Sequence, residues 1–251
     1  RTLPSGRIPL ATAARLGYGM LLGGVLLGWL AGVLVPWSET LPWRSGLIAT
    51  LLAGCVVAYD ARLKSTSLGP LAMGACRFLN VLLGMSAGAF GSDATWLTLG
   101  FSIPQLLAAA GIGIYIAGVT LFARTEARES DRLQLGMGLA VMVAGIVLLG
   151  LFPHYLPAIE LARWRADNGQ MLNLIWPMLL AVLSITIVRR CSVAVVSPSP
   201  EHVQSSVKSA IVSIVVLDAA VCFLMSGPYA ALGVLLLLVP MLLLGRWVYS
   251  T

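Results

Sequence analysis

The sequence is poor in charge. Asp, Glu, Lys and Arg together make up 10% of its 251 residues, whereas 59% of the residues are hydrophobic. A soluble domain carries about 25% charged residues, because its surface must face water. Several uncharged stretches are about 20 residues long, which is the length an α-helix needs to cross ~30 Å of hydrocarbon. The strict alternation of a transmembrane β-barrel is missing from runs such as 230–244. The composition therefore predicts an all-α, polytopic transmembrane helical bundle.

Cysteine and histidine are also scarce, with four and two residues, and no CxxC pair occurs. The cysteines are Cys55, Cys76, Cys191 and Cys222. Cys55, Cys76 and Cys222 lie in apolar runs, and we interpret them as small buried hydrophobic residues. Their spacing supports neither a disulfide framework nor a zinc site.

Basic residues outnumber acidic ones by 16 to 10, which gives a formal net charge of +6. A nucleic-acid partner would explain this excess, but no soluble domain with basic residues interleaved with aromatic ones is present. Cytoplasmic loops of membrane proteins collect Lys and Arg. We therefore expect a lipid bilayer and no nucleic acid among the partners.

Eight hydrophobic spans are predicted, separated by segments with proline, glycine or charge. They cover residues 13–35, 44–59, 70–91, 97–122, 134–152, 171–188, 206–225 and 229–248. This division puts most basic residues on one side of the membrane, with only Arg44, Arg163 and Arg165 on the other and Arg77 within a span. The asymmetry predicts a cytoplasmic N-terminus. No separate soluble domain is visible in the sequence, so we expect a single integral membrane domain over residues 1–251. We expect it in a bacterial inner (cytoplasmic) membrane.

Two charged residues, Arg77 and Asp218, lie well inside predicted spans, away from the span ends, where charge is costly unless it faces the bundle interior. Arg77 and Asn80 share a helix face one to two turns from the basic side, close to Arg62 and Lys64. These residues are either a phosphate-binding patch or ordinary interfacial basic residues. Asp218 is either a counter-charge to Arg77, a substrate hydrogen-bond acceptor or a structurally paired carboxylate.

An acidic cluster follows the fourth predicted span. Glu126 and Glu129 are three residues apart, and Asp131 is next to them on a helical extension. Such carboxylates could hold Mg²⁺, which prefers oxygen ligands and often bridges to phosphates. From spacing alone, a solvated cluster paired with the neighbouring arginines is the favoured interpretation.

Three segments resemble the UbiA superfamily of membrane-embedded prenyltransferases, in particular its EboC-like branch. Residues 1–8, RTLPSGRI, are similar to that family's R-P-L-P-S-G-R-I segment. Residues 59–64 resemble the family's Tyr-to-Lys loop, and residues 122–131 occupy the place of its second Asp-rich motif. The first Asp-rich motif would lie just upstream of Arg1, so we expect the chain to be the remainder of a longer protein.

The resemblance implies a UbiA-like fold and a reaction. A polyprenyl group moves from its diphosphate to an aromatic or other electron-rich acceptor, with Mg²⁺ and basic residues holding the diphosphate. By this resemblance Tyr59, Lys64 and Arg77 are catalytic, Arg7, Arg62, Asn80 and Asp218 bind substrate, and Glu126, Glu129 and Asp131 are metal ligands. The expected D-x-x-x-D motif instead has Glu126 and Ser130. Two other functions therefore stay open, a non-catalytic isoprenoid-lipid binding or transport protein and a small-solute transporter.

Overall fold

The computed structural model describes residues 9–34, 41–86, 99–125, 131–156, 172–240 and 243, and every regular element in these ranges is a helix. The α-helices are α1 (Leu10–Leu34), α2 (Arg44–Ala61), α3 (Gly69–Ser86), α4 (Ile103–Phe122), α5 (Arg132–Leu151), α7 (Leu172–Val196), α8 (Pro200–Ser226) and α9 (Pro228–Leu236). Short 3-10 turns are η2 (Leu63–Ser65), η4 (Ala123–Thr125) and η5 (Phe152–Tyr155). The all-α prediction is confirmed.

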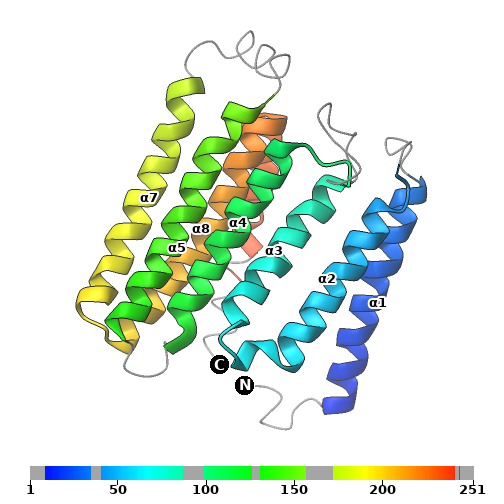
Figure 1. Cartoon of the computed structure of the whole chain (residues 1–251), viewed down its shortest axis with the longest axis horizontal. Coiled ribbons are helices and arrows are strands. Elements are labelled where there is room, and N and C mark those ends of the chain that lie inside the picture. The colour runs from blue at the N-terminus through cyan, green and yellow to red at the C-terminus, as the bar shows by residue number, and fades with distance from the viewer. Residues whose placement is uncertain are drawn as a thin grey trace.

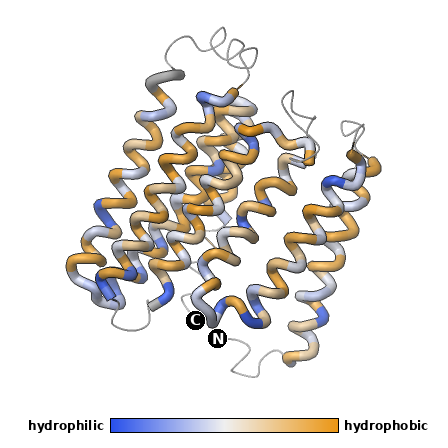
Figure 2. The backbone as a smooth tube through the Cα atoms, in the orientation of Figure 1, coloured by the Kyte–Doolittle hydropathy of each residue, from blue (hydrophilic) through white to orange (hydrophobic). Residues whose placement is uncertain are grey.

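Six of the described helices are long and apolar enough to cross a membrane, namely α1, α2, α4, α5 with its following turn, α7 and α8. Helix α3 occupies the third predicted span, and α9 begins the eighth as a shorter apolar helix. Part of the eighth predicted span lies outside the described residues. Hydrophobic residues cover most of the length of the helices (Figure 2). The chain is a multi-pass integral membrane protein.

The helices run alternately up and down and stand side by side (Figure 1). Helices α4, α5, α7 and α8 enclose the main hydrophobic core, with Tyr115, Met142 and Leu217 fully buried in it. Tyr115 also ties α4 to α8, because its hydroxyl donates a hydrogen bond to the Ala210 carbonyl oxygen at 3.0 Å. Helices α3, α2 and α1 extend from α4 in that order, and α9 packs on α8.

The ends of α7 and α8 differ from the prediction. We expected a break between 188 and 206, because Arg189 and Arg190 interrupt the apolar run. Instead α7 continues to Val196 and α8 begins at Pro200. Arginine is a good helix former, and its long side chain can carry the charge to the interface. The break therefore falls just before Pro200, at residues that favour the start of a new helix. Ser199 caps α8 by accepting a hydrogen bond from the His202 amide.

The start of α4 was predicted too early, at residue 97. The helix begins at Ile103, after a capping box in which Ser102 and Gln105 exchange hydrogen bonds. The Ser102 amide donates to Gln105 Oε1 at 2.9 Å. Because this box satisfies backbone amides that the first turn leaves without partners, it fixes the helix start. Gln105 therefore has a capping role at the start of α4.

Glycines bring α4 and α5 into backbone contact. Gly111 and Gly118 on α4 are seven residues apart, as are Gly138 and Gly145 on α5. A Cβ on Gly118 would lie 2.8 Å from the Gly138 carbonyl oxygen, and one on Gly145 would lie 2.7 Å from the Gly111 carbonyl oxygen. Without a hydrophobic force between helices in lipid, such close approach supplies the packing energy.

Replacing Gly145 by alanine is expected to destabilise the protein by about 1–3 kcal/mol, because the added methyl group overpacks the helix contact. Its nearest neighbours would be backbone atoms, including the Tyr115 amide nitrogen at 2.6 Å, which cannot rotate away. Gly136→Ala on the same helix is the matched control, because no atom lies within 4 Å of the added group. Thermal unfolding of the two variants in one detergent measures the difference. Equal unfolding temperatures would contradict the close contact.

The two ends of the bundle differ in charge. We call the basic end the one at which α1, α3, α5 and α8 begin, and the far end the opposite one. The described basic residues near the basic end are Arg15, Arg62, Lys64, Arg124, Arg132, Arg189, Arg190 and Lys208. Arg44, at the first residue of α2, lies at the far end. In the described residues, the predicted charge asymmetry is therefore confirmed.

Within the described residues, the fully buried part of helix α1 lies near the far end. Its buried residues are Gly28 and Gly32, which contact the start of α2 and the residues just before it. Trp29 packs against Gly46 and donates a hydrogen bond to Thr50 Oγ1 at 3.3 Å. The glycines of its first half, from Gly17 to Gly24, have no atom within 4 Å of an added Cβ.

Candidate functional site at the basic end

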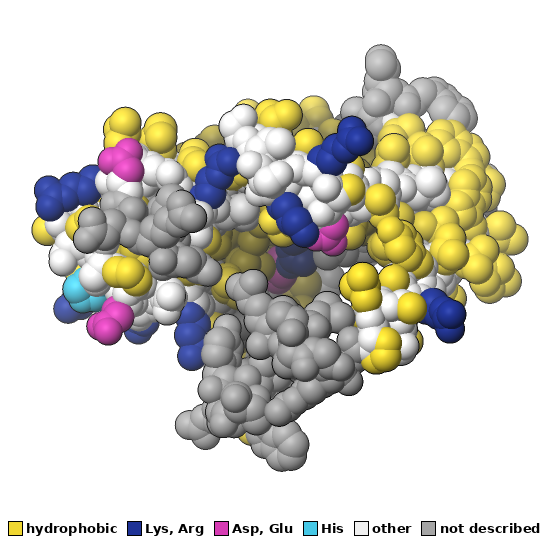
Figure 3. Space-filling model, turned by 90° about the horizontal axis from the view of Figure 1, so that it is seen from below, with side chains coloured by type: hydrophobic (Ala, Val, Ile, Leu, Met, Phe, Trp, Pro, Cys, Tyr) yellow, Lys and Arg dark blue, Asp and Glu magenta, His cyan; other side chains and the backbone are white. Residues whose placement is uncertain are grey.

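The face at the basic end is hollowed near its middle. Lys and Arg side chains gather around the hollow, and acidic side chains lie among them (Figure 3). The helices that border this end contribute apolar side chains to the hollow. A polar ligand can therefore approach from this face, while any hydrocarbon part of it would meet apolar walls.

Arg77 and Asp218 form an ion pair inside the bundle. The Arg77 Nη2 group donates to Asp218 Oδ2 and joins α3 to α8 across 141 residues of sequence. Arg77 lies about 12 Å along α3 from its start, at 1.5 Å per residue. The two side chains keep 27% and 23% of their surface accessible, so the pair is not sealed. The contact fits Asp218 as a counter-charge to Arg77, and it fits equally a carboxylate paired structurally between two helices.

The last turn of α2 and the turn that follows it hold three of the predicted site residues. Tyr59 is half-buried in the last turn of α2, whereas Arg62 and Lys64 are exposed. Lys64 Nζ lies 3.8 Å from Asp60 Oδ1, an exposed pair that contributes little stability. This turn is therefore accessible from solution.

Arg124 connects this turn to the end of α4. Its Nη2 group donates a hydrogen bond to the Thr66 carbonyl oxygen at 2.6 Å. From spacing we had expected Arg124 to pair with the acidic cluster that follows it, and Glu126 and Glu129 of that cluster lie outside the described residues. The contact nevertheless brings the residues that follow α2 and those that follow α4 together at one place.

Asn80 and Asp131, the remaining predicted site residues that the structure describes, do not join the Arg77–Asp218 pair. Asn80, one turn beyond Arg77, is exposed. The Asp131 carboxylate caps α5 by accepting a hydrogen bond from the Leu133 amide at 3.2 Å. Arg7, Glu126 and Glu129 lie outside the described residues. Within the described ranges, no group of three or more His, Cys, Asp or Glu side chains could hold a metal ion.

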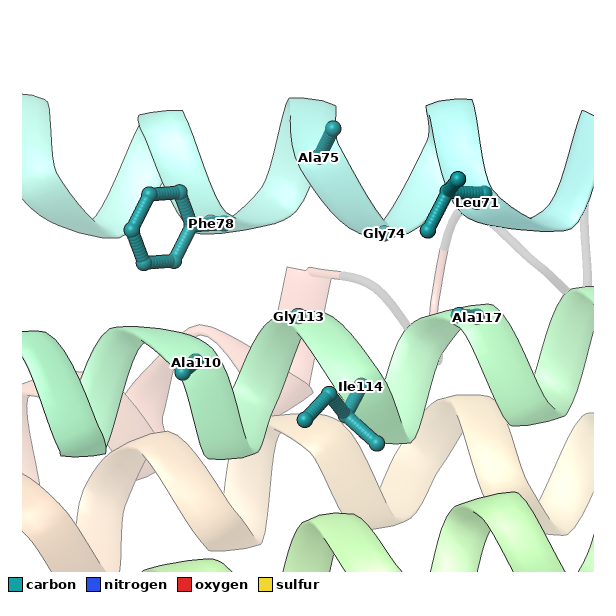
Figure 4. A pocket seen from close by; sticks show the side chains of 8 residues that line it. All are labelled: Leu71, Gly74, Ala75, Phe78, Ala110, Gly113, Ile114 and Ala117. Carbon is teal, nitrogen blue, oxygen red and sulfur yellow. The ribbon is translucent and has the colours of Figure 1, made fainter. Parts of the chain in front are cut away.

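An apolar groove of about 190 Å³ runs between α3 and α4 (Figure 4). Gly74 and Gly113 let the two backbones approach, since a Cβ on either would lie under 3.0 Å from the other's carbonyl oxygen. The groove is lined by Leu71, Gly74, Ala75, Phe78, Ala110, Gly113, Ile114 and Ala117. Phe78, which follows Arg77 on α3, lines the groove, so one helix contributes to both the groove and the ion pair.

Sequence reasoning missed the role of Arg44, which we had treated only as a charge on the far side. Its side chain is 1% exposed and donates to the carbonyl oxygens of Ser86 at 2.7 Å and Gly100 at 3.1 Å. The guanidinium also lies 4.9 Å from the centre of the Phe101 ring. One signal was available, because an arginine at the edge of a long apolar run must find partners.

No family model, curated protein or solved structure matches this chain. The resemblance to the UbiA superfamily therefore stays a prediction.

Proposed function

We propose that this protein binds a polyprenyl diphosphate at the basic end and transfers the prenyl group to an aromatic or other electron-rich acceptor in the membrane. The observation that carries the proposal is the Arg77–Asp218 pair, which is partly accessible and joins α3 to α8, a candidate membrane span. Charges at such positions usually mark a substrate or ion site, because their burial is costly. A guanidinium fork matches the geometry of a phosphate group.

The arrangement of charge suits a substrate with an anionic head and an apolar tail. Arg62, Lys64 and Arg124 stand where the head would arrive from solution and would raise its local concentration. Arg77 lies deeper along α3 and would bind the head once it has entered. The groove between α3 and α4 offers an apolar surface for the tail.

The chemistry follows from this placement. The bond between the allylic carbon and the diphosphate oxygen breaks, and its electron pair leaves with the diphosphate. Basic residues aimed at that oxygen, Arg77 and Lys64 in this proposal, stabilise the charge that develops there. The acceptor's ring carbon then bonds to the allylic carbon and loses its proton. Apolar helices keep out the water that would otherwise capture the cation.

In this proposal, a magnesium site would need ligands from residues outside the described ranges. Asp131, the one described member of the predicted ligand set, uses its carboxylate to cap α5. The described residues alone therefore do not form a magnesium site, and we derive no step through the ion. Glu126 and Glu129 would have to supply its ligands.

The second candidate is an isoprenoid-lipid binding or transport protein of the same fold, without turnover. The acidic motif favours it, because Ser130 replaces the expected second aspartate and a serine hydroxyl is a weaker Mg²⁺ ligand than a carboxylate. This protein would use the same basic end and the same groove. The two candidates differ in whether pyrophosphate is released.

The test is pyrophosphate release by the purified protein in detergent, with prenyl diphosphates of several chain lengths and aromatic acceptors. We expect release that requires Mg²⁺ and falls about tenfold or more in Glu126→Gln and in Lys64→Gln, since each loses a charged contact of about 1.5–3 kcal/mol. Arg132→Gln is the matched control, because Arg132 is an exposed basic residue at the start of α5.

Three results separate the candidates. Metal-dependent release with the expected losses supports the transferase. Prenyl diphosphate binding without release, unchanged in Glu126→Gln and without Mg²⁺, would replace it by the binding protein. Absence of binding at every chain length would contradict both.

A further inference from the structure

Two cysteines that are 21 residues apart in sequence meet inside the bundle. Cys76 Sγ on α3 lies 3.3 Å from Cys55 Sγ on α2, and Cys55 Sγ lies 3.6 Å from the Ala72 carbonyl oxygen. Both thiols are free. Nothing in the spacing of the cysteines predicts this contact, because each lies alone in an apolar run. Their contact comes from the packing of α2 on α3.

The surroundings of the pair are apolar and partly open. Cys76 is buried at 9% exposure, whereas Cys55 is half-buried. The outward side chains of the same two helices, such as Leu51, Val57 and Leu71, are hydrophobic and exposed. In a membrane-spanning helix such residues face lipid. An oxidant that reaches Cys55 therefore needs to be soluble in the bilayer.

We propose that Cys55 and Cys76 are a redox-active dithiol that closes into a disulfide within the membrane, with a lipid-soluble quinone as the oxidant. The two S–H bonds break, one S–S bond forms, and the two electrons and two protons reduce the quinone to a quinol. A thiol reductant reverses the reaction by exchange. Neither cysteine is used by the proposed prenyl transfer, and the inference does not depend on it.

The geometry requires only a small adjustment. A disulfide has its sulfurs about 2.0 Å apart, so the thiols must approach by roughly 1.3 Å. The two sulfurs already lie in contact, because α2 and α3 are packed together. Cys76 precedes Arg77, and Cys55 lies one turn before Tyr59. The bond would therefore fix the spacing of two helices that carry residues of the candidate site.

Cys191 and Cys222 provide the background for a test. They lie on α7 and α8, and among the described cysteines only Cys55 and Cys76 have their sulfurs in contact. The full chain with Cys191→Ser and Cys222→Ser is reconstituted in lipid nanodiscs and treated with a fully substituted benzoquinone. Such a quinone accepts electrons but has no free ring position to which a thiol can add. Thiols are then counted after denaturation with a mass-tagged maleimide.

We expect both thiols to be lost, one quinol to form per chain, and both thiols to return after treatment with dithiothreitol. Adding Cys55→Ser or Cys76→Ser to this background should leave the single remaining thiol fully reactive. Retention of both thiols at saturating quinone would overturn the proposal. So would thiol loss in the single-cysteine variants, or covalent dimers on a non-reducing gel in place of an internally linked monomer.

Discussion

Replacing Arg77 by methionine is expected to destabilise the protein by about 3 kcal/mol, because it leaves the Asp218 carboxylate without its partner inside the bundle. The estimate is at the low end for a broken buried pair, since about a quarter of each side chain is accessible. The unfolding temperature in detergent should fall by several degrees. Binding of a prenyl diphosphate should weaken about ten- to a hundredfold, as expected for the loss of a charged hydrogen-bond donor.

The double variant Arg77→Met with Asp218→Leu separates these two effects. Hydrophobic residues of similar size often replace a buried ion pair at no cost in stability. We therefore expect the double variant to unfold close to the wild-type temperature while diphosphate binding stays lost. Asp218→Asn keeps the shape and removes the competing carboxylate, so it should retain binding.

Two outcomes would contradict this interpretation of the pair. Wild-type diphosphate affinity in the double variant would show that the pair only joins α3 to α8. Loss of binding in Asp218→Asn without loss of stability would show that the carboxylate, and not the guanidinium, meets the ligand.

Replacing Arg44 by methionine is expected to cost about 3–5 kcal/mol, comparable to or larger than the effect at Arg77. Two carbonyl oxygens, those of Ser86 and Gly100, would lose their buried donor, at about 1–3 kcal/mol each. The contact with the Phe101 ring, worth about 1 kcal/mol or more, would also be lost. The measurement is thermal unfolding in detergent, in which unfolding is detected as loss of the monodisperse protein peak.

The control for Arg44 is Arg132→Met, because Arg132 is exposed and its substitution should change stability by less than about 0.5 kcal/mol. Diphosphate binding by the folded fraction of Arg44→Met should equal that of the wild type, since Arg44 lies at the far end. An equal, small change in both variants would mean that the far-end contacts do not stabilise the bundle.

The sequence predicted the membrane class and the order of helices, because lipid imposes a simple rule. A helix that crosses hydrocarbon needs a long apolar run, and such a run is visible without knowledge of its neighbours. Helix ends were harder. The prediction of a break at Arg189 was wrong, because charge alone does not stop a helix. Pro200 and the Ser102 capping box are sequence features that indicate the true starts of α8 and α4.

The site was predictable only in part, because packing decides which distant residues meet. The cost of charge in lipid indicated that Arg77 and Asp218 need partners, and pairing them was one of the alternatives considered. The Arg44 contacts and the Cys55–Cys76 contact depend on how helices face each other, which one chain's apolar pattern does not encode. Hydrophobic periodicity identifies a buried face but not the residue opposite it.

The uneven attachment of α1 determines how this helix can move. Trp29, Gly28 and Gly32 hold it near the far end, while among the described residues no atom lies close to the glycines from Gly17 to Gly24. The helix is about 37 Å long, at 1.5 Å per residue. A tilt of about 5° around that fixed point displaces the opposite tip by roughly 3 Å over this length. A small tilt of α1 therefore moves its first residues more than its last ones. The packing of lipid beside α1 should vary most in the leaflet that borders the basic residues.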